Sequence, residues 1–126
     1  QFGPEQLLRA AFTAAVGAAD PLQCVPRCLP AAPRGRAILI GAGKAAAAMA
    51  LAVDRHWPGE LYGTVVTPYG CAVDCPRIEV LEASHPLPSP AGLGATERIL
   101  ERVRNSSVDD LVICVLSGGG SALLTL

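Results

Sequence analysis

The chain has 126 residues, enough for one compact core and too few for two. Hydrophobic residues make up 51% of the chain and charged residues 17%, which excludes a disordered tail and indicates a globular core. The formal net charge of −1 supplies no basic stripe for nucleic acid or an anionic membrane. The longest apolar run, Ala45–Val53, is less than half of the roughly 20 residues that span a bilayer. We therefore expect a soluble, cytoplasmic protein without a membrane anchor.

The first 35 residues combine a predicted helix with a proline-rich linker. Within residues 4–16, Leu8, Phe12 and Val16 share one face at helical spacing, and Pro4 stands at the first helical position, which proline favours. Residues 17–35 carry four prolines and two cysteines, which predicts a surface linker without regular structure. We expect residues 1–35 to pack on a domain formed by residues 36–126.

From residue 36 onward, short apolar segments alternate with glycine- or proline-marked turns and helical segments. The pattern predicts strands at residues 37–40, 61–67, 77–82 and 111–116, and helices at 44–56 and 91–104. Strands that are apolar on both faces and alternate with helices are typical of a parallel sheet covered on both sides. The predicted fold class is α/β: a doubly wound, mainly parallel, Rossmann-like sheet that is incomplete at its carboxyl end.

Unusual loop chemistry follows each predicted strand. Because ligands of open parallel sheets bind beyond the carboxyl ends of the strands, we expect loops 41–44, 67–70, 83–86 and 117–121 at one edge. Asp109 and Asp110 stand at the amino end of the fourth strand. We expect both to be solvated charges at the opposite edge.

The turn Gly41-Ala42-Gly43-Lys44 is the most informative of these loops. Its two glycines permit close backbone approach, and the following helix would present free N–H groups to an anion. Lys44 stands where the helix dipole disfavours a cation, and it is the only lysine among the ten basic residues. A functional ammonium group facing an anion explains both features. A solvated or locally paired lysine is the simpler alternative.

Two known phosphate-binding motifs fit this turn poorly. A Walker A loop requires glycine at the position of Ile38 and Ser or Thr at that of Ala45. The dinucleotide fingerprint fits loosely with Gly41, Gly43 and Ala46, but no acid ends the second strand to bind a ribose. A nicotinamide cofactor is thereby disfavoured and stays open.

The loop Ser117-Gly118-Gly119-Gly120-Ser121 is the second candidate. Three successive glycines cost backbone entropy unless positive φ angles or close ligand approach require them. A nest of N–H groups for phosphate or carboxylate would use them, and a tight turn without a ligand is the alternative. A serine hydrolase is disfavoured, because the G-x-S-x-G elbow requires a glycine on both sides and each serine has only one of the two.

His85 lies after the third predicted strand, in a loop that three prolines stiffen. Its imidazole could donate to an anionic substrate or transfer a proton. Hydrogen bonds to local carbonyl groups are an equally good explanation.

The cysteine pairs Cys24 and Cys28, and Cys71 and Cys75, have spacings that metal sites tolerate. Both pairs lie in irregular, proline-bearing segments that lack other features of a zinc ribbon. We therefore expect reduced thiols and neither a metal site nor a disulfide.

In their order along the chain, these motifs resemble the amino-terminal domain of the type II glycerate kinases (glycerate 2-kinases), a family often labelled hydroxypyruvate reductase. The resemblance covers nearly the whole chain. The Gly-Ala-Gly-Lys and Ser-Gly-Gly-Gly-Ser pieces are specific in this order, although each alone is not. The segments that carry the resemblance are Leu39–Ala45, Gly63–Thr67, Glu82–Pro88, Ala91-Gly92, Asp109–Val112 and Ser117–Leu124.

The resemblance implies ATP-dependent phosphorylation of the 2-hydroxyl of glycerate with Mg²⁺, giving 2-phosphoglycerate, within glyoxylate and serine metabolism. Lys44 and His85 would be catalytic, with Lys44 facing the transferring phosphoryl group or the substrate and His85 at the rim. No metal ligand is assigned. The residues expected to bind the cofactor are Gly41, Gly43, Ser117, Gly118, Gly119, Gly120 and Ser121.

The family pattern continues past residue 126, so we expect the isolated chain to be an inactive fragment whose partner is a missing carboxyl-terminal domain. A homodimer is compatible with the sequence. We also expect an exposed apolar patch, made to pack against the missing parts. Two other functions stay open: an NAD(P)H-dependent hydroxypyruvate reductase and a non-catalytic nucleotide- or phosphate-binding module.

Overall fold

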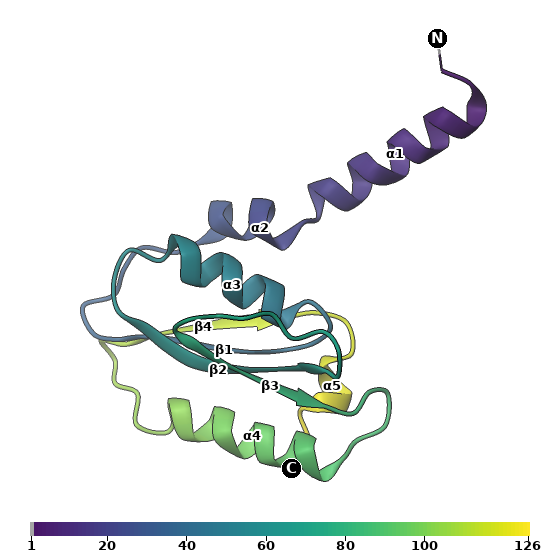
Figure 1. The fold of residues 1–126 in the computed structure, drawn as a ribbon. Helices are drawn as coiled ribbons and strands as arrows, with labels where there is room; N and C mark the ends of the chain where they lie inside the picture. Colours follow the sequence, from purple (N-terminus) through teal and green to yellow (C-terminus); the bar gives the residue numbers. More distant parts are fainter. Residues whose placement is uncertain (1) are drawn as a thin grey trace.

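A computed structural model describes residues 2–126 of the chain. Four parallel strands form one sheet with the order β3-β2-β1-β4. Helix α3 (Ala46–His56) covers one face of the sheet and α4 (Pro90–Val103) covers the other (Figure 1). The predicted α/β fold with helices on both faces is confirmed. The strands are β1 (Ala37–Ala42), β2 (Leu61–Pro68), β3 (Ile78–Ala83) and β4 (Leu111–Leu116).

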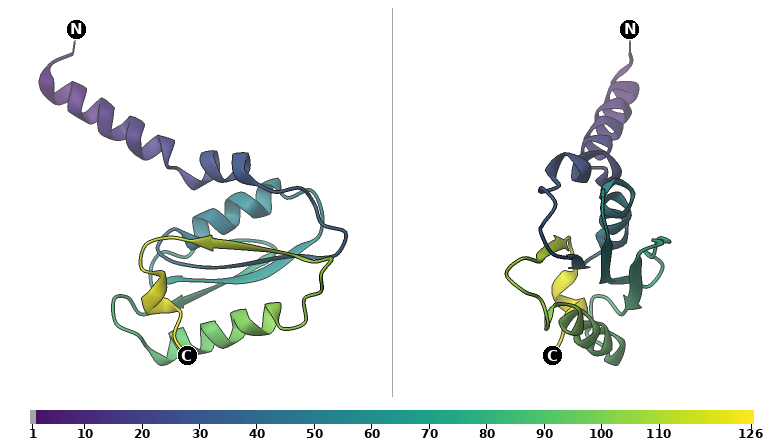
Figure 2. Two further views of the ribbon diagram at one scale, coloured as in Figure 1. Left: turned by 180° about the vertical axis from the view of Figure 1, so that it is seen from behind. Right: turned by 90° about the vertical axis from the view of Figure 1, so that its left-hand side faces the viewer.

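The register of the strands brings their carboxyl ends to one edge of the sheet. The last residue of β1, Ala42, lies opposite Val66 of β2 and Leu116 of β4. The turns that follow β1 and β4 therefore leave the sheet side by side, although they are far apart in the sequence (Figure 2).

Side chains along each strand alternate between the two faces of the sheet, so the fold has two hydrophobic cores. On the α3 side, Leu39 and Val65 are fully buried against Ala50 and Val53 of the helix. The small alanine side chains of α3 let the helix lie close to the sheet. On the α4 side, the core contains Ala42, Val66, Ala83, Ala95, Ile99 and Leu123.

A polar network joins α4 to the sheet. Thr64 Oγ1 donates to Glu79 Oε2 (2.9 Å), and Arg98 and Arg102 donate to the same carboxylate oxygen at 2.9 and 3.0 Å. Arg102 Nε also donates to Thr64 Oγ1 at 2.9 Å. Desolvation raises the pKa of Glu79, but these hydrogen bonds lower it by more, and the net shift is downward.

Helix α1 (Pro4–Ala18) forms as predicted, but it does not pack on the domain. None of its residues is buried, and the side chains of Leu8 and Phe12 are 71% and 72% exposed. Figure 1 shows α1 leading away from the sheet. Every helix within residues 2–126, α1 included, is too short or too polar to cross a lipid bilayer.

The proline-rich segment is more regular than the sequence predicted. It contains a short helix, α2 (Pro21–Cys24), and a 3-10 helix, η1 (Val25–Cys28), where we expected no regular element. The side chain of Asp20 accepts from the Leu22 N–H at 3.0 Å and caps α2, and Pro21 occupies the first helical position. Val25 packs against the α3-side core. This segment, rather than α1, packs on the domain.

Asp110, at the amino edge of the sheet, corrects another expectation. Its side chain is 4% exposed, and its carboxylate accepts from Arg36 Nη2 at 2.7 Å and from the Ser107 N–H at 2.8 Å. Arg36 lies beside Asp110 because β1 and β4 pair in register from Ala37 and Leu111. Only the neighbouring Asp109 is exposed, as expected for a solvated charge.

Candidate functional site

The two glycine-bearing turns meet at the carboxyl edge of the sheet. The Ser117 N–H donates to the Ala42 carbonyl at 3.1 Å, and the Lys44 N–H donates to the Gly118 carbonyl at 2.9 Å. Backbone hydrogen bonds therefore join the turn after β1 to the loop after β4. The structure brings together the two motifs that the sequence singled out.

Gly43 makes this close approach possible. Its φ is +130°, a region that side chains strongly disfavour, and its N–H donates to the Val66 carbonyl at 3.1 Å. A Cβ at this position would overlap Ser117 Oγ and lie 2.6 Å from the Ser117 carbonyl oxygen. The close contact between the two turns thus requires glycine at position 43, and Gly43 is buried.

Gly41 has a different role from the one the motif suggested. It lies inside β1 and is buried, and an added Cβ would overlap Val115 of the neighbouring strand. Its small size is a packing requirement between β1 and β4.

Three backbone N–H groups where the β1 turn enters α3 are used inside the protein. The Ala45 N–H donates to Ser117 Oγ at 2.9 Å, and the Ala46 N–H donates to the Gly43 carbonyl at 3.1 Å. With the Lys44 N–H bound to Gly118, three successive amides have internal acceptors. These three amides are therefore not free to bind an anion. The exposed Lys44 side chain is what the turn offers instead.

The glycine loop after β4 has the open amides. Among the hydrogen bonds of residues 2–126, none has a donor N–H from residues 118–121, and Gly118 and Ser121 are exposed. Gly119 has a φ of +86° and precedes the short helix α5 (Gly120–Leu123). Peptide N–H groups without internal acceptors suit phosphate or carboxylate oxygens.

The end of α5 holds this loop in place. Leu123 is fully buried, and the Thr125 N–H donates to Thr96 Oγ1 of α4 at 3.0 Å. An added Cβ on Gly92 of α4 would lie 3.1 Å from the Leu123 carbonyl oxygen. The loop is therefore anchored on both sides, by β4 and by α4.

His85 reaches the glycine loop from the segment after β3. An added Cβ on Gly119 would lie 2.7 Å from His85 Nε2, which places the imidazole directly against the loop backbone. His85 is half-buried. The structure thus places His85 of the β3 loop against the glycine-loop backbone, and the β1 turn that is hydrogen-bonded to this loop carries the exposed Lys44.

Sequence reasoning missed one residue at this edge. Thr67, at the end of β2, is fully buried, and its hydroxyl donates to the Gly43 carbonyl at 3.0 Å. The sequence contained only a weak signal, a threonine next to proline in the loop expected at this edge. Its partner lies in a distant segment of the chain.

No group of three or more His, Cys, Asp or Glu side chains that could hold a metal occurs within residues 2–126. Mg²⁺ in kinases is bound by one or two carboxylates together with substrate phosphates. Glu82, the last residue of β3 but one, lies near this edge, but its carboxylate already accepts from the Gly70 N–H at 2.9 Å. The open amides of residues 118–121 suit phosphate oxygens, and no metal ligand is assigned among the described residues.

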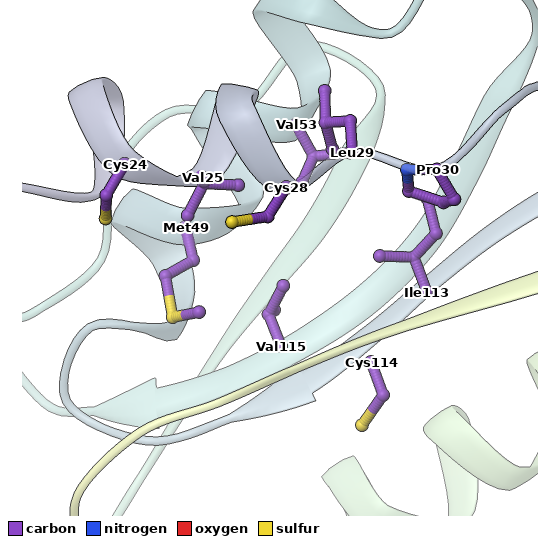
Figure 3. Close-up of a pocket in the computed structure, with 10 residues that line it drawn as sticks. All are labelled: Cys24, Val25, Cys28, Leu29, Pro30, Met49, Val53, Ile113, Cys114 and Val115. Atoms are coloured by element: carbon purple, nitrogen blue, oxygen red, sulfur yellow. The ribbon is translucent and has the colours of Figure 1, made fainter.

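An apolar groove lies between η1, α3 and β4, away from the glycine turns. Met49 and Val115 line it together with Cys24 and Cys28, whereas Cys114 points to the other side of β4 (Figure 3). The five cysteines are free thiols. The groove has no charged lining residue, so it does not offer the chemistry of the glycine turns.

Residues 7–126 match the model of a family described as a domain of unknown function, DUF4147. A protein of Agrobacterium vitis with the provisional name hydroxypyruvate reductase is 54% identical over 120 residues, covering 94% of this chain and 27% of that protein. The D-glycerate 2-kinase of Thermotoga maritima is 36% identical over 132 residues, covering 99% of this chain and 31% of the kinase.

Solved structures agree with these matches. A crystal structure of glycerate kinase from Thermotoga maritima has a TM-score of 0.79 and 33% identity, and it covers 95% of this chain and 30% of that one. A Pyrococcus horikoshii protein has a TM-score of 0.81 and 31% identity, with 94% and 31% covered. The chain spans less than a third of the length of these relatives. The chain belongs to the DUF4147 family, and its resemblance to the amino-terminal domain of the type II glycerate kinases is confirmed.

Proposed function

We propose that this chain is part of a glycerate 2-kinase, which transfers the γ-phosphoryl group of ATP to the 2-hydroxyl of glycerate. The observation that carries the proposal is the hydrogen bonding between two turns. One turn carries the exposed Lys44, and the other contains the amides of residues 118–121, which have no internal acceptors. Phosphoryl transfer needs positioning and charge neutralisation more than covalent chemistry. Relatives named glycerate 2-kinase in Thermotoga maritima and Pyrococcus horikoshii support the same reaction.

In this proposal, the loop amides, Lys44 and His85 have different roles. The amides of residues 118–121 bind oxygens of a phosphate or of the glycerate carboxylate. The Lys44 ammonium neutralises the charge that develops on the transferring group. His85, against Gly119, lies where it can accept the proton of the substrate hydroxyl. Bound Mg²⁺ would supply further neutralisation of phosphate charge.

The test is glycerate-dependent release of ADP by the full-length protein and its Lys44→Met variant. Removal of the ammonium should lower kcat by about 10²–10³-fold, the range found for loss of one group that stabilises transition-state charge. Arg55→Met is the matched control, because Arg55 is an exposed cation at the other end of α3. Equal rates for wild type and Lys44→Met would contradict the role of Lys44.

A second candidate, a hydroxypyruvate reductase, is favoured by the name of the Agrobacterium vitis relative. Two features of the site weigh against it. A dinucleotide pyrophosphate binds the amides of the first strand-to-helix turn, and here Lys44 and Ala45 donate theirs to Gly118 and Ser117. β2 also ends at Pro68 without an acid for the ribose. Oxidation of NADH with hydroxypyruvate, without ADP formation from ATP and glycerate, would favour the reductase.

A further inference from the structure

We propose that Ser117 and Thr67 are positioning residues, whose hydroxyls hold the backbone on both sides of Lys44. Their effect on rate rests on the proposed kinase function. Their effect on the local backbone does not. The backbone of Lys44 and the amides of the glycine loop then keep a fixed relative position, because one side chain from β2 and one just after β4 hold the turn that follows β1.

The peptide before Lys44 is held by β2. Thr67 Oγ1 donates to the Gly43 carbonyl oxygen at 3.0 Å, and this carbonyl oxygen also accepts from the Ala46 N–H. Thr67 is fully buried, so no water or ligand competes for this hydrogen bond. The carbonyl just before Lys44 therefore has one orientation.

The peptide after Lys44 is held by β4. Ser117 Oγ accepts from the Ala45 N–H at 2.9 Å, while the Ser117 N–H donates to the Ala42 carbonyl at 3.1 Å. Its hydroxyl also lies in the space that a Cβ on Gly43 would need. The sequence placed Ser117 among the cofactor ligands, but its hydroxyl contacts the Lys44 turn.

These contacts predict a specific kinetic signature. Displacement of a reacting group by about 1 Å can cost on the order of 10²-fold in rate without a matching loss of binding. The loop amides that would bind phosphate belong to residues 118–121, which neither hydroxyl contacts directly. Loss of either hydroxyl should therefore lower kcat and leave KM for ATP nearly unchanged.

The experiment compares Thr67→Val and Ser117→Ala with Thr64→Val in the full-length protein. Thr64 is the matched control, since it is also fully buried on β2 but donates to Glu79, away from the site. We expect kcat to fall by about 10–100-fold in the first two variants, with KM for ATP within about twofold. Thr64→Val should keep kcat within about twofold. Thr67→Ser, which retains the hydroxyl, should restore most of the rate.

Hydrogen–deuterium exchange over residues 43–47 supplies a readout independent of activity. Thr67→Val and Ser117→Ala should increase exchange there, and Thr64→Val should not. If the wild type releases no ADP with glycerate, the kinase proposal fails, while the exchange rates still decide whether the hydroxyls hold the turn. Unchanged exchange in folded Thr67→Val and Ser117→Ala variants would overturn the positioning role. In an active enzyme, unchanged kcat in both would also overturn it.

Discussion

The backbone N–H of Lys44 donates a 2.9 Å hydrogen bond to the carbonyl oxygen of Gly118. This bond makes one structural unit of two turns that are far apart in the sequence. Because the bond joins backbone groups, replacing the Lys44 side chain does not remove it. A Lys44 variant therefore tests the ammonium group separately from the architecture that holds it.

Gly43→Ala should destabilise the protein more than Gly70→Ala. Both glycines have positive φ, +130° and +83°, which costs an alanine about 1–3 kcal/mol. Only at Gly43 does the added Cβ also meet another residue, Ser117, whereas nothing lies within 4 Å of a Cβ on Gly70. Urea denaturation of the two variants measures the difference. Equal losses would show that the contact with Ser117 relaxes at no cost.

Asp110→Asn should make the protein less stable at neutral pH and remove part of its acid sensitivity. The Arg36 guanidinium, the Arg36 N–H and the Ser107 N–H lower the pKa of the Asp110 carboxyl below its ordinary value. A lowered folded-state pKa adds stability above the unfolded pKa of about 4, and this is lost as pH falls through the folded pKa.

The gap in thermal midpoint between wild type and Asp110→Asn should thus be widest near pH 7 and narrow below about pH 4. Asp109→Asn is the control, because Asp109 is exposed and forms no ion pair within residues 2–126. A gap that stays constant from pH 7 to pH 3 would contradict the effect of Arg36 on Asp110.

Cys75 should be the slowest of the five thiols to react with iodoacetamide at pH 8. Burial, helped by the charges of Asp54 and Asp74, raises the pKa of Cys75 to about 11, so almost no thiolate forms. Cys28 is exposed and should react first. Mass spectrometry of partially labelled protein gives the order, and early labelling of Cys75 would show that its segment opens readily.

The exposed face of α1 should cause self-association of the 126-residue chain. Leu8, Phe12 and Val16 lie on this face and are 71%, 72% and 55% exposed. Leu8→Glu with Phe12→Glu should lower the apparent mass in analytical ultracentrifugation and leave the thermal midpoint unchanged, since no residue of α1 is buried. A loss of thermal stability in this variant would mean that α1 packs on the domain after all.

The elements of the sheet were predictable because most strand residues are apolar and glycine- or proline-marked turns separate the strands from the helices. Predicted and observed strand bounds differ by two residues or fewer; the third strand, for example, was expected at residues 77–82 and spans Ile78–Ala83. α2 was missed because the four prolines of residues 17–35 outweighed the capping signal of Asp20 and Pro21. The strand order was not predictable, since it depends on pairing between distant segments.

At the site, too, local sequence signals were predictable and contacts between distant segments were not. Gly43, Lys44 and the glycine loop stood out because their local sequence breaks the usual preferences of a turn or a helix start. The contacts of the Thr67 and Ser117 hydroxyls were not predictable, because their partners lie in a distant segment of the chain. The ion pair of Asp110 was not predictable for the same reason, since its partner Arg36 precedes β1.

The most direct test of the account is the rate of ADP release from ATP by the full-length protein, with and without glycerate, for wild type and Lys44→Met. We expect glycerate-dependent release by the wild type and a fall of about 10²–10³-fold in Lys44→Met, with Arg55→Met unaffected. Undiminished release by Lys44→Met, or NADH oxidation with hydroxypyruvate in place of ADP formation, would contradict it.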